Sequence, residues 1–296
     1  MAESRRKTTS RRELARNPRF EQVSPEVGEL DEAAIDAAMR DDPDETMALI
    51  ADLTAATDPK LRELARRLAG RLFLDVGRRG AVRPRGVGKI VERKYRPDGG
   101  DLDLDASLDG LVDAGGRGRA IDPERLRIRG WAKPGTALCL LLDRSGSMGG
   151  KPLASSAVAA AAVSYWAPHD YSVVAFGSDI VVTKSQDADK SSDRVVNDVL
   201  ALRGFGTTDL AGALRVASDQ LARSRAGRKI VVVLSDCRAT VEGDSVAAAA
   251  QLQEVVVIAP EGDSAAAEEF ARRTGARMAT AAGPAAVVDA LATLLD

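Results

Sequence analysis

Six short apolar segments alternate with helical segments over the second half of the chain, and this alternation constrains the fold more than any other feature. The predicted strands lie at 137–142, 171–176, 179–183, 229–235, 254–259 and 276–279. The predicted helices lie at 152–166, 191–202, 209–224, 243–251, 263–274 and 284–295. Short apolar runs are typical of strands buried on both faces, and strands that alternate with helices form parallel sheets covered on both sides. The sequence therefore predicts an α/β fold, a doubly wound, mostly parallel six-stranded sheet over residues 134–296.

The first of these strands ends in a loop that carries oxygen donors at alternate positions. Asp143 ends the apolar run, and Ser145 and Ser147 follow it, with Gly146 between them. One carboxylate and two hydroxyls make a poor acid–base pair, whereas hard cations such as Mg²⁺ prefer oxygen ligands. We therefore expect this loop to hold a divalent cation.

Two later stretches offer further oxygen donors. The glycine-rich loop 204–210 carries Thr208 just before a helical pattern, and the apolar segment 229–235 is followed by Asp236. In a doubly wound sheet, ligands bind at the carboxyl ends of the strands. We therefore expect Thr208 and Asp236 to lie close to the Asp143 loop.

Taken in order, Asp143-Arg-Ser-Gly-Ser147, Thr208 and Asp236 resemble the metal-ion-dependent adhesion site (MIDAS) of von Willebrand factor A (VWA) domains. That pattern is Asp-x-Ser-x-Ser, a Thr in a glycine-rich loop and an Asp after a later apolar strand. The resemblance implies that the two serines bind Mg²⁺, or Mn²⁺, through their hydroxyls. It implies that Thr208, Asp143 and Asp236 act directly or through bound water. It also implies one open coordination position, which an acidic side chain of a protein partner can fill.

Two positions depart from the family pattern. Cys237 stands where many relatives have Gly, and Gly206-Thr207 replaces a Gly-Gly pair. Neither change removes an oxygen ligand, but Cys237 is a candidate to crowd the metal loop.

The N-terminal half has a different composition. Residues 1–25 are polar and basic, which predicts a disordered tail. Residues 26–76 show three amphipathic helical patterns, which form a bundle too small to be stable alone, so we expect it to pack on the main domain or on a partner. Residues 77–133 are rich in Gly and Pro and predict a linker, with an edge strand where apolar and basic residues alternate near its end.

Lys and Arg are dense between positions 60 and 96, and acidic residues follow at 98–113. Arg62, Arg66 and Arg67 share one face of the third helix and are candidate partner-binding residues. The functional alternative is a docking surface for nucleic acid or an acidic partner. The structural alternative is a solvated face that pairs with the acidic stretch. Base-stacking aromatic residues are nearly absent from this region, and the net charge is −2, so nucleic acid is disfavoured.

The motifs argue against an enzyme. No general base accompanies the serines of the Asp143 loop, and the single histidine, His169, precedes a predicted strand. The glycine–lysine pairs at 88–89 and 150–151 do not complete a phosphate-binding loop. Cys139 and Cys237 are expected to be a reduced pair. No apolar run reaches the roughly 18–20 residues of a membrane span, and no secretory signal is recognised, so we expect a cytoplasmic protein.

The predicted helical, basic N-terminal region followed by this site resembles cytoplasmic VWA proteins that work with MoxR-type AAA+ ATPases. These include the CoxE-like group and, more distantly, the D subunit of magnesium chelatase. The resemblance implies a non-enzymatic, Mg²⁺-dependent adaptor whose metal site engages an acidic residue on the ATPase or its client, during maturation or remodelling of a client metalloenzyme. The alternative hypothesis is a stand-alone metal-dependent binding module that meets RNA through residues 60–96.

Overall fold

The computed structural model of the chain describes residues 8–79, 89–94, 101–115, 126–132, 135–145, 150–204 and 206–295. It divides into two compact units. The larger unit consists of Met1–Arg83 and Thr136–Asp296, and the smaller unit is Pro84–Gly135.

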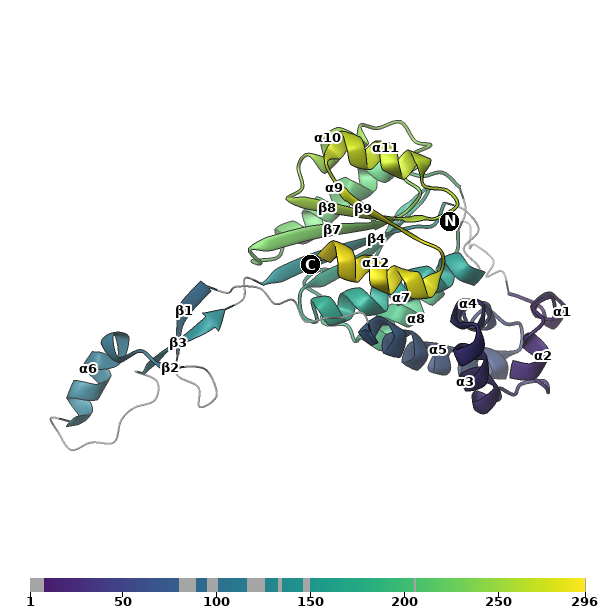
Figure 1. Ribbon diagram of the computed structural model, residues 1–296, viewed down its shortest axis with the longest axis horizontal. Helices are drawn as coiled ribbons and strands as arrows, with labels where there is room; N and C mark the ends of the chain where they lie inside the picture. The colour runs from purple at the N-terminus through teal and green to yellow at the C-terminus, as the bar shows by residue number, and fades with distance from the viewer. Residues whose placement is uncertain are drawn as a thin grey trace, which may run out of the picture. The chain divides into compact units, whose positions relative to one another are not determined.

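A six-stranded sheet forms the centre of the larger unit (Figure 1). Its strands are β4 (Thr136–Asp143), β5 (Tyr171–Phe176), β6 (Ile180–Lys184), β7 (Arg228–Leu234), β8 (Glu254–Pro260) and β9 (Arg277–Ala281). Their spatial order is β6-β5-β4-β7-β8-β9, and every pair is parallel except the β5–β6 pair at one edge. The predicted fold class, a doubly wound and mostly parallel six-stranded sheet, is confirmed.

Helices cover both faces of this sheet (Figure 1). On one face lie α7 (Gly150–Trp166), α8 (Ser192–Leu200) and α12 (Pro284–Leu295). On the other face lie α9 (Leu210–Ala222), α10 (Ser245–Ala249) and α11 (Ala265–Thr274). Successive side chains of β4 alternate between the two cores, because a strand points neighbouring residues to opposite faces. The central strand β4 is therefore buried on both sides, as its unbroken apolar sequence requires.

Helix α7 is buried on all sides. Residues 157–162 are small and apolar, and each is at most 1% exposed. The sheet covers one side of α7, and two N-terminal helices, α4 (Pro43–Leu53) and α5 (Pro59–Arg79), cover the other. A helix that is apolar all round needs such double cover. With α3 (Glu32–Asp41), these helices occupy the predicted helical region and pack on the sheet domain.

Two short helices precede this layer, within the stretch whose composition predicts a disordered tail. They are α1 (Arg11–Leu14) and α2 (Phe20–Val23), and Leu14, Phe20 and Val23 are buried in the same core as α4 and α5. Because only three buried apolar residues occur in this segment, its overall composition remains polar and predicts disorder. Their side chains nevertheless pack in the core with α4 and α5. The first seven residues lie outside the described residues.

The smaller unit contains a second sheet. Its strands are β1 (Lys89–Lys94), β2 (Asp101–Leu102) and β3 (Arg127–Ala132), and they are antiparallel in the order β1-β3-β2. Helix α6 (Leu104–Gly115) is held to β3 by the Ser107 hydroxyl, which accepts from the Arg127 N–H at 2.8 Å and donates to the Arg127 carbonyl at 3.2 Å. The strand that alternation predicts at the end of residues 77–133 is thus the central strand of this separate sheet.

The close approach of α5 and α7 makes a prediction about Gly77. A Cβ atom there would lie 2.7 Å from the Ala162 nitrogen and 2.9 Å from the Ala161 Cβ. Gly77→Ala should lower the free energy of unfolding by about 1–2 kcal/mol, because overpacking costs about 1–3 kcal/mol and alanine recovers about 0.5–1 kcal/mol of helix propensity. Urea unfolding followed by circular dichroism measures this. Gly262→Ala is the control, since a Cβ at that position would have no neighbour within 4 Å; equal stability of the two variants would contradict the contact.

Candidate metal centre

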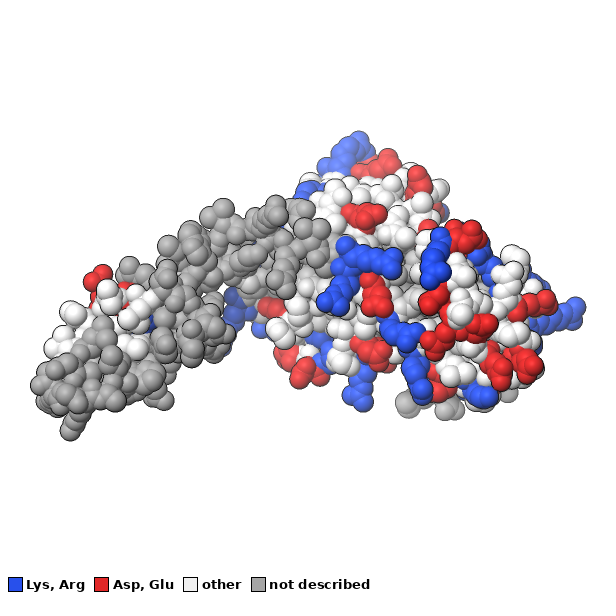
Figure 2. Space-filling view, turned by 60° about the horizontal axis from the view of Figure 1, so that its bottom comes forward, with Lys and Arg blue, Asp and Glu red and all other residues white. Residues whose placement is uncertain are grey.

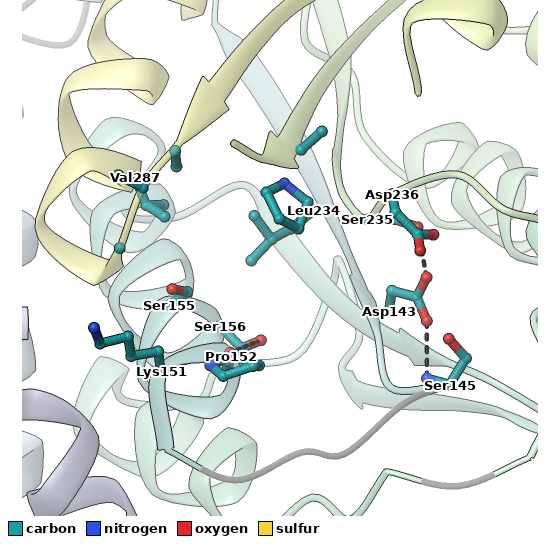
Figure 3. Close-up of a pocket in the computed structure, with 15 residues that line it drawn as sticks. Asp143, Ser145, Lys151, Pro152, Ser155, Ser156, Leu234, Ser235, Asp236 and Val287 are labelled. Atoms are coloured by element: carbon teal, nitrogen blue, oxygen red, sulfur yellow. Dashed lines mark hydrogen bonds between the residues drawn. The ribbon is translucent and has the colours of Figure 1, made fainter. Parts of the chain in front are cut away.

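The Asp143 carboxylate is held at both oxygens where β4 ends. Oδ1 accepts a hydrogen bond from the Ser145 N–H at 2.8 Å, and Oδ2 accepts one from the Ser235 hydroxyl at 2.5 Å (Figure 3). The first bond arises from the tight loop that follows the strand. The second crosses from β4 to the end of its parallel neighbour, β7. The carboxylate is therefore fixed in orientation by two adjacent strands.

The end of β7 supplies the second carboxylate. Asp236 follows Ser235, and its Oδ1 accepts a hydrogen bond from the Arg238 N–H at 2.9 Å. Asp143, Ser145, Ser235 and Asp236 all line one cavity of about 360 Å³ (Figure 3). Three of the five predicted metal ligands, namely Asp143, Ser145 and Asp236, thus meet at the carboxyl edge of the sheet.

The other two predicted ligands, Thr208 and Ser147, are not among the described residues that line this cavity. Thr208 is 3% exposed and lies in the loop before α9. Its N–H donates to the Thr240 hydroxyl at 2.8 Å, and its carbonyl accepts from the Thr240 N–H at 3.1 Å. The Thr208 loop is thereby tied to the segment that follows Asp236, although Thr208 is not one of the described residues lining the cavity. Ser147 lies outside the described residues.

Arg144 anchors the loop from the opposite side. Its side chain is buried, and its guanidinium pairs with Asp179 and donates to the Asp179 and Arg203 carbonyls, each at 3.2 Å. Its backbone N–H donates to the Phe176 carbonyl at 2.8 Å. Its charge is therefore engaged in the turn between β5 and β6 and in the chain after α8.

Ser235 is a residue of the candidate site that sequence reasoning missed. It is 5% exposed, and its hydroxyl oxygen accepts from the Cys237 N–H at 2.8 Å while it donates to Asp143. One hydroxyl thus joins the two loops that carry the carboxylates. The only signal in the sequence is a polar residue directly before the strand-ending Asp236, and the need for it depends on β4 and β7 being neighbours.

Cys237 occupies a backbone conformation that favours glycine. Its φ is 59°, in the left-handed region that glycine adopts without strain, so the Gly of the MIDAS pattern would fit this position and Cys237 departs from it at a conformational cost. Burial, followed by the carboxylates of Asp236 and Asp143, raises the pKa of its thiol to about 12. Burial likewise raises the pKa of Cys139 to about 12. Both cysteines are free and buried, so the thiols are protonated and unreactive near neutral pH.

The donors present fit a hard cation. The cavity end formed by the two loops offers two carboxylates and a serine hydroxyl, all oxygen ligands. Over the described part of the chain there is no group of three or more His, Cys, Asp or Glu that could hold a metal. The donors that line the cavity, two carboxylates and a hydroxyl, are of the kind that suits Mg²⁺ or Mn²⁺.

A family model described as VWA domain containing CoxE-like protein matches residues 78–295. The chain belongs to this family. The match covers the smaller unit and the sheet domain, and it leaves α1 to α4 and most of α5 outside. The comparison with curated proteins gave no match.

Three solved structures are similar to this chain. An aerotolerance-related membrane protein from Bacteroides fragilis is 18% identical with a TM-score of 0.45, over 54% of this chain and 98% of that chain. Manganese-loaded TRAP protein from Plasmodium vivax is 18% identical with a TM-score of 0.42, over 53% and 72%. A von Willebrand factor type A protein from Catenulispora acidiphila is 14% identical with a TM-score of 0.42, over 56% and 43%. In the present chain, no described helix is long and apolar enough to cross a membrane.

The role of Ser235 can be measured directly. Ser235→Ala leaves a buried N–H and one carboxylate oxygen without their partner, so it should cost about 1–3 kcal/mol of stability. Chemical denaturation checks this. Ser178→Ala is the control, because that hydroxyl is exposed and makes a 3.5 Å contact with Asp179; a loss no larger than that of the control would refute the linking role of Ser235.

Proposed function

We propose that the protein is a non-enzymatic, Mg²⁺-dependent protein-binding adaptor. The observation that carries this proposal is the convergence of Asp143, Ser145 and Asp236 on one cavity at the carboxyl edge of the sheet. The family supports it, since the sequence also carries Ser147 and Thr208 at the remaining MIDAS positions. The proposed ligand set is these five residues, with Mn²⁺ as an alternative cation.

In such a site, the residues of the chain would have separate roles. The cation, when bound, supplies a coordination position for a carboxylate of the partner. Asp143 and Asp236 balance its charge, and the Ser145 N–H and the Ser235 hydroxyl keep Asp143 in one orientation. The rest of the cavity wall is mostly apolar and includes Leu234, Ala259, Pro260, Ala281 and Val287. The cavity therefore favours an acidic residue next to an apolar side chain.

The position of the histidine supports a non-enzymatic role. His169 lies in the turn that precedes β5 and is exposed. In the parallel β4–β5 pair, the start of β5 lies beside Leu138, whereas Asp143 pairs with Phe176 at the other end. The imidazole is thus at the opposite edge of the sheet from the serines and cannot serve them as a general base.

The predicted partner-binding arginines lie on α5 among acidic groups. Arg66 and Arg67 line one surface pocket with Glu63, Asp193 and Asp198. Arg62 donates to the Ala56 carbonyl at 3.4 Å. Figure 2 shows Lys and Arg interspersed with Asp and Glu over the described face. Around Arg66 and Arg67 the charges are therefore mixed rather than uniformly basic, which favours a protein partner over RNA at this part of α5. From residue 80 on, the stretch 60–96 lies largely outside the described residues.

We further propose that the partner is a MoxR-type AAA+ ATPase or its client, in the cytoplasm, and that the adaptor acts in maturation or remodelling of a client metalloenzyme. The CoxE-like family membership supports this assignment. Arg62, Arg66 and Arg67 remain candidate contacts for that partner.

The proposed metal site predicts that Mg²⁺ changes the melting temperature of the protein. Millimolar Mg²⁺ should raise the melting temperature, because a ligand at 100 times its Kd stabilises the native state by about 2.7 kcal/mol. Asp143→Ala or Ser145→Ala should abolish the shift. Differential scanning calorimetry measures it, and Asp41→Ala is the control because Asp41 makes only a surface ion pair with Arg19. An unchanged melting temperature in wild-type protein at millimolar Mg²⁺ or Mn²⁺ would count against the site.

Partner binding makes a second prediction. Affinity capture with the wild-type chain in Mg²⁺ should retain a MoxR-type ATPase or its client, and chelator should release it. Ser147→Ala should give the chelator result even in Mg²⁺, because it removes a proposed ligand. Capture that is unaffected by both chelator and the substitution would show that binding does not use the metal.

A further inference from the structure

Helix α4, which lies outside the family match, is bonded to two helices of the sheet domain. Asp52 Oδ1 accepts a hydrogen bond from the Gly150 N–H at 2.7 Å. Asp44 Oδ1 accepts one from the Ala285 N–H at 2.8 Å. Gly150 is the first residue of α7, and Ala285 is in the first turn of α12. Two carboxylates of one helix therefore satisfy free N–H groups at the starts of two others, where negative charge is favoured.

Both of these helix starts adjoin the metal-site cavity. Gly150 is the first described residue after the Asp143 loop, and the next two residues, Lys151 and Pro152, line the cavity. On the other side, Gly283 and Val287 line it, just before and just inside the first turns of α12 (Figure 3). Helix α4 thus contacts two sides of the cavity: Asp52, near its end, bonds to the start of α7, and Asp44, near its beginning, bonds to the start of α12.

The helices are in contact at Gly150 and fit closely at Gly283. Gly150 has a φ of 53°, which favours glycine, and a Cβ there would make ordinary van der Waals contact, 3.8 Å from Asp52 Oδ2 and 3.9 Å from the Ala48 Cβ. A Cβ at Gly283 would collide with the Asp44 carboxylate. Glycine at 283 therefore lets Asp44 reach α12. An ion pair of 2.7 Å between Lys151 Nζ and Glu45 Oε1 adds a third contact between α4 and the cavity rim.

These caps differ from the ordinary caps in the same protein. Asp31, Asp42, Asp209 and Asp244 each accept from an N–H three residues further along their own helix. Asp52 and Asp44 instead act over 98 and 241 residues of sequence. Burial raises the pKa of Asp52, and the Gly150 N–H opposes that rise, so this carboxylate is partly desolvated to make the contact. Unlike the ordinary caps, the two distant caps tie α4 to the starts of α7 and α12, so they fix the positions of these helices relative to α4.

We infer that α4 is a positioning element of the metal site, and that Asp52 is a positioning residue that sets cation affinity by fixing the end of the metal loop at Gly150. The inference rests on the proposed function, since it concerns the same site. Asp52 does not line the cavity, so it acts through the loop rather than on the cation. Residues that orient metal ligands change metal affinity by about 10–100-fold when they are removed.

The test is the Mg²⁺ dissociation constant of the whole chain, measured by isothermal titration calorimetry. Asp52→Ala should weaken Mg²⁺ binding about 10-fold or more. Asp52→Asn keeps an Oδ1 acceptor in place and should bind within about threefold of wild type, because position rather than charge is required. Asp31→Ala is the control, since it removes a helix cap from an aspartate, a 3.0 Å bond from the Ala34 N–H, that stays within α3 and reaches no residue of the cavity lining. It should lower stability and leave Mg²⁺ affinity unchanged.

The outcomes separate this inference from the proposed function. Wild-type protein that fails to bind Mg²⁺ overturns both. Wild-type protein that binds, together with Asp52→Ala that binds equally well, overturns the positioning role alone and leaves Asp52 a structural cap. Should Asp52→Ala not fold, Asp52→Ser, whose side chain is one bond shorter than that of Asp, replaces it. The expected result is the same loss of affinity, and wild-type affinity in that variant would refute the inference.

Discussion

The burial of α7 on every side is the constraint on which the rest of the larger unit depends. Its run of alanines lets the sheet approach from one side and α4 and α5 from the other, and Gly77 of α5 lies directly against its backbone. Larger side chains along α7 would separate these layers. Because the Asp143 loop leads into α7, the position of this helix also determines where the loop can end.

The candidate metal centre follows from the parallel sheet. Strands β4 and β7 are neighbours, so the residues that follow them share one edge, and the Ser235 hydroxyl joins the two loops there. The carboxylates of Asp143 and Asp236 line the same cavity, where their like charges favour a bound cation. The order of the strands in the sheet therefore brings these oxygen donors together, although they lie far apart in the sequence.

Most of the sheet domain could be predicted from the sequence, because strands buried on both faces have unbroken apolar runs and the helices between them, apart from the uniformly apolar α7, have amphipathic patterns. All six strands overlap their predicted ranges, and Asp143 and Asp236 lie at strand ends as predicted. What could not be predicted depends on contacts between distant segments. The link through Ser235 requires knowing that β4 and β7 are adjacent, and the caps from Asp52 and Asp44 span 98 and 241 residues. The second sheet, in the smaller unit, could not be predicted because its strands lie in charged and glycine-rich sequence, which has the composition of a linker. The roles of Thr208 and Ser147 remain predictions.

The bond from Asp44 to Ala285 has a consequence for the order in which the protein is assembled during synthesis. Chains emerge from the ribosome with the N-terminus first, so α4 is made long before the helix that it caps. The wall of the cavity that α12 provides can form only after residues 284–295 have emerged. A nascent chain that already holds the Asp143 loop therefore lacks the wall of the cavity beside α12 until translation has passed residues 284–295.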